Sequence, residues 1–85
     1  MIEIKIPKLD NNSDIAIISW NVKNKEKVTK GQILADIETS KAVEELKSEK
    51  DGYIHILEEY GSEVPFNTTI AYIADTKEEL EKINQ

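Results

Sequence analysis

The chain has 85 residues, and its 11 lysines, absence of arginine and 17 acidic residues give a formal net charge of −6. The absence of cysteine excludes disulfide scaffolds, thiolate metal sites and cysteine nucleophiles, and one histidine, His55, cannot form a multi-histidine metal site. The length allows one domain with a small core, and the acidic balance argues against a nucleic-acid partner.

The first half of the chain alternates apolar and polar residues with a period of two, which predicts short β-strands between turns. Pro7 should end the first strand, and the polar run at 10–14 is typical of a turn. Ile33, Ala35 and Ile37 are expected to share one face of their strand. The strands predicted in this half are residues 2–6, 15–22, 28 and 33–38.

The second half repeats this pattern and ends in a helical segment. Thr76 stands three residues before Glu79, which is the spacing of a helix capping box, so residues 77–83 should form a short helix. We divide the chain into a β domain, residues 1–75, and a helical tail or linker, residues 76–85, from which a longer protein can continue. The strands predicted in this half are residues 43–47, 53–57, 64 and 68–74.

Many short strands with regularly spaced turns predict an all-β sandwich or barrel. Aligning the chain with itself at an offset of 36 residues also matches apolar positions across several turns. Any two β segments share some alternation, but the matches here favour two related structural halves. The matched pairs include Ile18 with Ile54, Val28 with Val64, Leu34 with Ile70, Ala35 with Ala71, and Ile37 with Ile73.

The sequence also limits where the domain works. No apolar run approaches the ~20 residues that a membrane span requires. The first six residues alternate and do not form the apolar core of a signal peptide. We therefore expect a monomeric cytoplasmic domain with no membrane partner.

The predicted hairpin at 33–47 places Lys41 in the turn between its two strands. An enzyme that acylates one lysine among 11 needs a geometric label, and a lysine on a protruding turn supplies one. The turn reads Glu38-Thr39-Ser40-Lys41-Ala42, and it resembles the hairpin motif of the lipoyl domain in the biotinyl/lipoyl carrier family. The resemblance extends over residues 2–75 and includes Gly31-Gln32 and Asp51-Gly52-Tyr53-Ile54.

The resemblance implies a flattened barrel of two four-stranded antiparallel sheets with quasi-two-fold symmetry, followed by the helical tail. It implies that Gly31 and Gly52 are turn glycines that flank the hairpin. It also implies that Lys41 carries lipoate as an amide, a swinging arm for acyl or electron transfer. The domain itself would be non-catalytic.

The resemblance also implies two kinds of partner. A lipoyl-attaching ligase or transferase would read Glu38, Ser40 and Ala42 around the lysine. Dehydrogenase, acyltransferase or flavoprotein enzymes, as in 2-oxo acid dehydrogenase complexes, would load and unload the arm. Glu44 and Glu45, close to the lysine, could orient such a partner electrostatically.

Two departures from the family pattern keep other hypotheses open. Ser40 stands where the family most often has aspartate, and Glu44 stands where an apolar residue is common. These changes suit an unmodified lipoyl-like interaction or scaffolding module of a larger enzyme, for example a transferase. A biotin carrier is the less favoured alternative, because that subfamily flanks its lysine with methionines rather than with Ser40 and Ala42.

The aromatic residues receive structural interpretations. Trp20 is expected in the core or at its boundary. The side chain of His55 should point outward from its strand. Tyr53, Tyr60 and Tyr72 should pack at the edges and rim of the sheets.

Overall fold

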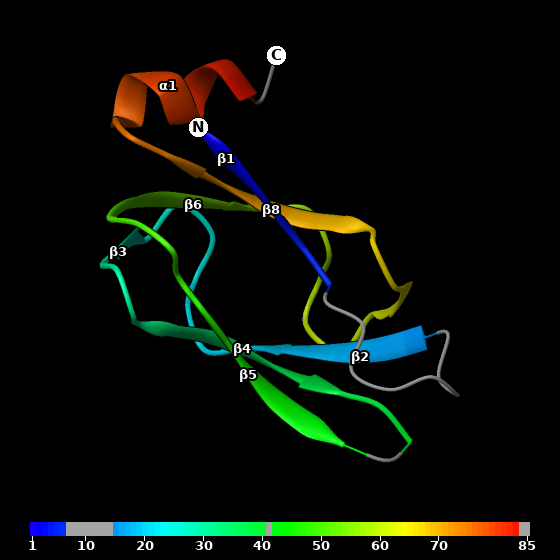
Figure 1. Ribbon diagram of the computed structural model, residues 1–85. Coiled ribbons are helices and arrows are strands. Elements are labelled where there is room, and N and C mark those ends of the chain that lie inside the picture. Colours follow the sequence, from blue (N-terminus) through cyan, green and yellow to red (C-terminus); the bar gives the residue numbers. More distant parts are fainter. Residues whose placement is uncertain (7–14, 41, 84–85) are drawn as a thin grey trace.

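The computed structural model describes residues 1–6, 15–40 and 42–83, and it shows two four-stranded antiparallel sheets and one short helix (Figure 1). One sheet has the strand order β1-β8-β6-β3 and the other β5-β4-β2-β7. The all-β prediction is therefore confirmed. The elements are β1 (Ile2–Lys5), β2 (Ile15–Trp20), β3 (Lys27–Val28), β4 (Ile33–Glu38), β5 (Val43–Lys47), β6 (Gly52–Ile56), β7 (Glu63–Pro65), β8 (Thr69–Ala74) and α1 (Lys77–Ile83).

The predicted strands match these elements to within one or two residues. The first strand ends at Lys5 and the second at Trp20, slightly earlier than predicted. Pro7 and the turn predicted at 10–14 lie outside the described residues.

The core lies between the two sheets and is built from the inward residues of each strand. Burial of such a side chain stabilises the fold by about 1.5–3 kcal/mol. Trp20 lies at the edge of this core, as predicted, and its indole N–H donates a 2.7 Å hydrogen bond to the carbonyl oxygen of Glu58. The largest fully buried side chains are Ile18, Leu34, Ile37, Ile54, Ile70, Ile73 and Val28.

The alternation predicted for β4 is wrong at its first residues. Leu34 is fully buried, whereas Ile33 is exposed. The register with β5 shifts between Ile33 and Ala35, because Ile33 pairs with Lys47 and Ala35 with Leu46. This bulge places one extra residue on β4 and turns Leu34 into the core.

The two sheets are related by quasi-two-fold symmetry, as predicted. Exchanging β1 with β5, β8 with β4, β6 with β2 and β3 with β7 converts one strand order into the other. The turn hydrogen bonds follow the same relation at the offset of 36 residues. The Asn21 N–H donates to the Leu34 carbonyl (2.8 Å), and the Leu57 N–H donates to the Ile70 carbonyl (2.9 Å).

Two hydrogen bonds between the halves are related to each other by the same quasi-two-fold symmetry. The Lys25 N–H donates to the Ile54 carbonyl, and the Gly61 N–H donates to the Ile18 carbonyl, both at 2.7 Å. Adding 36 to Lys25 and subtracting 36 from Ile54 converts the first bond into the second. In each half, a turn residue therefore donates a backbone hydrogen bond to a strand of the other half.

The positive backbone φ angles repeat in the same way. Lys25 (φ 71°) corresponds to Gly61 (φ 81°), and Gly31 (φ 87°) corresponds to Asn67 (φ 66°). A left-handed conformation is costly for lysine, whereas glycine adopts it without a Cβ penalty. The symmetry thus identifies Lys25 as a position whose structural equivalent already uses glycine.

We expect Lys25→Gly to raise the free energy of unfolding by about 0.5–1 kcal/mol. Chemical denaturation followed by tryptophan fluorescence measures this change. Lys23→Gly removes the same charge where φ is not positive, so it should lower stability. Equal destabilisation by both changes would contradict the expectation.

The helix α1 packs against β6 and β8 on the face that points away from the core. Its Leu80 is buried together with Ala74 of β8. His55 points away from the main core, as predicted, but it is only 9% exposed because α1 lies over this face. Among the tyrosines, Tyr60 departs from the predicted rim packing and is 71% exposed, because it lies in the tip of a turn.

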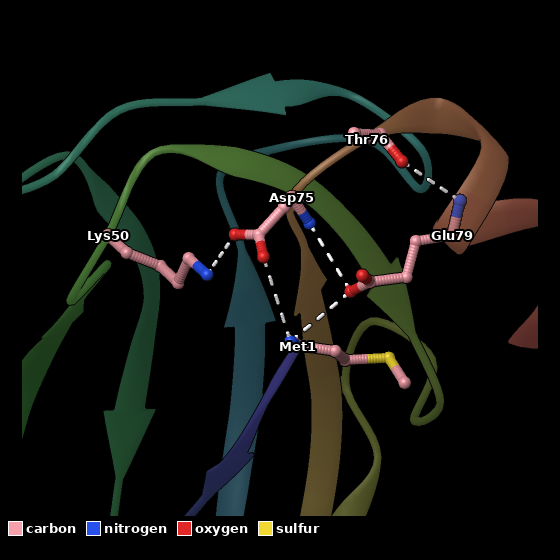
Figure 2. Close-up of polar contacts among 5 residues, drawn as sticks. All are labelled: Met1, Lys50, Asp75, Thr76 and Glu79. Atoms are coloured by element: carbon pink, nitrogen blue, oxygen red, sulfur yellow. Dashed lines mark hydrogen bonds and ion pairs between the residues drawn. The ribbon is translucent and has the colours of Figure 1, made fainter.

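Polar contacts at the start of α1 join the helix to the N-terminus (Figure 2). The Glu79 N–H donates to Thr76 Oγ1 (3.1 Å), so Thr76 caps the helix as predicted. The carboxylate of Glu79 accepts from the N–H of Asp75 (3.4 Å) rather than from that of Thr76, which modifies the predicted capping box. The Met1 ammonium lies 3.3 Å from Glu79 and 3.9 Å from Asp75.

Asp75 also forms an ion pair with Lys50, and this hydrogen bond and charge lower the pKa of its carboxyl below 3.8, the ordinary value. A depressed folded-state pKa stabilises the fold above the unfolded value, and this stability is lost as pH falls through the folded pKa. We expect Asp75→Asn to lower the Tm at neutral pH and to match the unsubstituted chain well below pH 3.8. Thermal unfolding across this range measures the gap, and a gap that stays constant with pH would contradict the expectation.

Candidate functional site

The most specific sequence motif lies at the end of the β4–β5 hairpin. The two strands pair in register up to Glu38 and Val43. The Thr39 N–H donates to the Ala42 carbonyl (2.8 Å), and the Ala42 N–H donates to Thr39 Oγ1 (3.1 Å). The chain therefore reverses within a short turn that the threonine side chain braces. Lys41 itself lies outside the described residues.

This turn stands at the opposite end of the molecule from α1 and the N-terminal residue (Figure 1). The quasi-symmetry explains the arrangement. Ile37 pairs with Glu44 in the hairpin, and its equivalent Ile73 pairs with Ile2. One half thus ends in a continuous hairpin. At the corresponding place, the other half has the N-terminus and the start of α1.

The described residues of the turn leave its outer side accessible. Glu38 and Ser40 are exposed, and Thr39 and Ala42 are half-buried. Ser40 and Ala42, which flank Lys41 in the sequence, both have small side chains. Such a turn can present a side chain to a protein partner. The described residues contain no group of three or more histidine, cysteine, aspartate or glutamate side chains that could hold a metal ion.

A shallow depression of about 430 Å³ lies beside the turn. Glu38, Thr39 and Ser40 form one side of it, and residues of β2 and β7 form the other. Sequence reasoning missed the contribution of β2, whose Ile15 and Ile17 line this depression. The missed signal is that Ile15 and Ile17 alternate with the buried Ala16 and Ile18, so both faces of β2 are apolar.

The two glycines of the predicted site have different surroundings. Gly31 adopts a positive φ in a turn, where its N–H donates to the Ser48 carbonyl at 2.8 Å. Gly52 is the first residue of β6, not part of a turn. A Cβ at this position would lie 2.3 Å from the carbonyl oxygen of Ala74 in β8. Close approach of the backbone therefore requires glycine at position 52.

Glu44 and Glu45 are both exposed on β5. Glu44 pairs with the buried Ile37, yet it remains in contact with water because β5 is the edge strand of its sheet. The edge position explains how glutamate is accepted where an apolar residue is common. The departure from the family pattern leaves the fold intact.

Two equivalent four-stranded sheets, with the Lys41 motif at the end of a hairpin in one of them, have the architecture of a small carrier domain. The biotin/lipoyl family model, described as "Biotin-requiring enzyme", matches residues 2–73. The chain belongs to this biotinyl/lipoyl family, and its structure is that of a lipoyl domain.

Known proteins agree with this assignment. The solution structure of the lipoyl domain of the 2-oxoglutarate dehydrogenase complex from Azotobacter vinelandii has a TM-score of 0.75 and 29% identity, covering 89% of this chain and 99% of that domain. The dihydrolipoyllysine-residue acetyltransferase component of the Zymomonas mobilis pyruvate dehydrogenase complex is 35% identical over 96% of this chain and 19% of its own length. The pyruvate dehydrogenase complex protein X component of Chaetomium thermophilum is 35% identical over 79% of this chain and 16% of its own length. The chain therefore spans less than a quarter of these curated relatives.

The part of the chain that the structure describes contains no helix long and apolar enough to cross a membrane.

Proposed function

We propose that this domain carries lipoate as an amide on Lys41 and presents it to partner enzymes without catalysing a reaction itself. The observation that carries the proposal is the braced turn. Its hydrogen bonds join Thr39 and Ala42, the residues between which the motif lysine lies in the sequence. The lipoyl-domain structure and the acyltransferase relatives support it.

The described residues of the turn suit such a group. A lysine between Ser40 and Ala42 has small neighbours, and the turn stands away from α1, so an extended arm would meet little obstruction (Figure 1). When bound, the dithiolane would supply acyl and electron transfer. The chain contributes the ε-amine, whose charge is lost in the amide, and the β4–β5 hairpin that carries it.

Recognition by the attaching ligase or transferase would use the residues around the lysine. Glu38 is exposed at the end of β4 and offers a carboxylate two residues before Ser40. Ser40 and Ala42 give the enzyme access to the amine. We further propose dehydrogenase, acyltransferase and flavoprotein enzymes as the partners of the loaded arm, and the cytoplasm as its location.

Intact mass spectrometry tests the modification directly. After incubation with a lipoyl ligase, ATP and lipoic acid, the chain is expected to gain the mass of one lipoyl amide. Lys41→Arg should gain none, because arginine lacks the amine nucleophile, whereas Lys47→Arg should gain the same mass as the unsubstituted chain. No added mass, or an addition that persists in Lys41→Arg, would refute the proposal.

A second candidate is an unmodified interaction module, which the exposed Ser40 and Glu44 favour because both depart from the lipoyl pattern. It predicts that the chain isolated from its native source has an unaltered mass. For the biotin alternative, incubation with a biotin ligase should leave the mass unchanged, because Ser40 and Ala42 replace the flanking methionines.

A further inference from the structure

The outer faces of the two sheets differ in whether a helix packs on them. The helix α1 packs on the outer face of β6 and β8. Under the quasi-symmetry, the corresponding face is the outer side of β2 and β4. Among the described elements, no helix or strand packs over that face. One of two equivalent surfaces is therefore covered by the chain's own helix, whereas none of the described elements covers its counterpart.

The open face is apolar at the end nearest the lysine turn. Ile15, Ile17 and Val43 are 51%, 37% and 63% exposed, although residues of this type are usually buried. The strand register places Val43 opposite Glu38, Glu38 opposite Ile17, and Ile17 opposite Glu63. Apolar and acidic side chains thus alternate in a row across all four strands of the sheet.

The charges on this part of the sheet have one sign. Asp36 and Glu45 pair across β4 and β5 and extend the row formed by Glu38 and Glu63. Among the described residues, the cation on this face is Lys47, which pairs with Ile33 at the other end of β5. The turn-proximal part therefore combines exposed aliphatic side chains with four carboxylates.

We propose that this acidic apolar face, formed by Ile15, Ile17, Glu38, Val43 and Glu63, binds a partner-protein segment that carries aliphatic side chains flanked by lysine or arginine. Aliphatic contacts with the isoleucines and the valine would supply affinity. The carboxylates would steer and orient the cationic groups. The inference extends the proposed carrier function, because a partner seated here would lie beside the turn that bears Lys41.

A synthetic eight-residue peptide that alternates leucine and lysine is a suitable probe. Titrated into the ¹⁵N-labelled chain, it is expected to shift amide resonances of β2, β4, β5 and β7 and to leave those of α1 unchanged. The double substitution Ile17→Thr with Glu63→Gln removes one aliphatic and one charge contact and should weaken binding about tenfold, which corresponds to about 1.4 kcal/mol. The matched control, Leu57→Thr with Glu78→Gln, also replaces one exposed aliphatic and one acidic residue, but away from this face, and should bind as tightly as the unsubstituted chain.

Two further arms keep the result decisive. The charge-only variant Glu45→Gln with Glu63→Gln leaves the apolar residues in place. It should lower the affinity and make the affinity less dependent on salt concentration. A peptide of alternating leucine and glutamate should not bind. Equal binding of both peptides, shifts centred on α1, or unchanged affinity in both face variants would overturn the proposal. The titration uses lipoylated and unmodified chain in parallel, so a failure of lipoylation appears as missing mass and is distinguishable from a failure of docking.

Discussion

Exchanging Ser40 and Lys41, by combining Ser40→Lys with Lys41→Ser, is expected to slow lipoylation strongly while composition and net charge stay the same. The turn is closed by the Thr39 N–H bond to the Ala42 carbonyl and braced by Thr39 Oγ1. The exchange moves the amine by one residue relative to this hydrogen-bonded pair. A lysine displaced by one residue would present its amine away from the position that the ligase reads from Glu38.

The rate of modification should fall by at least about 100-fold, because a displacement of even 1 Å can cost that factor in an oriented reaction. A time course of intact mass with ligase, ATP and lipoic acid measures it. The exchange of two exposed α1 residues, Glu81→Lys with Lys82→Glu, serves as the control and should be lipoylated at the normal rate. Efficient lipoylation of the displaced lysine would show that the ligase does not require the amine at position 41.

The fold could be predicted well from the sequence because the alternation of apolar residues and the 36-residue repeat indicate the same strands. Alternation located the strands, and the offset of 36 residues related β2 to β6 and β4 to β8. The structure adds that backbone hydrogen bonds obey the same offset, as Lys25 with Ile54 and Gly61 with Ile18 show. Backbone bonds are independent of side-chain identity, so the symmetry persists where polar residues differ between the halves.

Features that depend on contacts between distant segments could not be predicted in this way. The bulge at Ile33 and Ala35 depends on how β5 pairs with β4, and alternation along β4 alone cannot reveal it. The burial of His55 depends on where α1 packs. A single strand pattern shows which residues share a face but not what covers that face.

The candidate site shows the same division. The motif around Lys41 could be identified from sequence, and its described neighbours Thr39 and Ala42 form the turn. The roles of Glu38, Ser40 and Ala42 in ligase recognition remain predictions. The exposed Ile15 and Ile17 were missed, because the sequence shows that both faces of β2 are apolar but not which of them stays exposed.

Gly52 lies where β6 approaches its neighbouring strand too closely for any side chain. It begins β6, which pairs with β8 on one side and β3 on the other. A Cβ there would lie 2.3 Å from the Ala74 carbonyl oxygen and 2.8 Å from Cγ2 of Ile73. The first of these is a backbone atom within a paired strand, so the clash cannot be relieved by rotating a side chain.

Gly52→Ala is therefore expected to lower the free energy of unfolding by about 3 kcal/mol, the upper end of the range for overpacking in a core. For a chain of this length such a loss removes a large share of the total stability, at about 0.05–0.15 kcal/mol per residue. Urea denaturation followed by the fluorescence of Trp20 measures it. Gly61→Ala meets no atom within 4 Å and is strained only by its φ of 81°, so it should cost the smaller amount of about 1–2 kcal/mol. If the two substitutions destabilised the chain equally, the close approach of Gly52 to β8 would not be what requires glycine there.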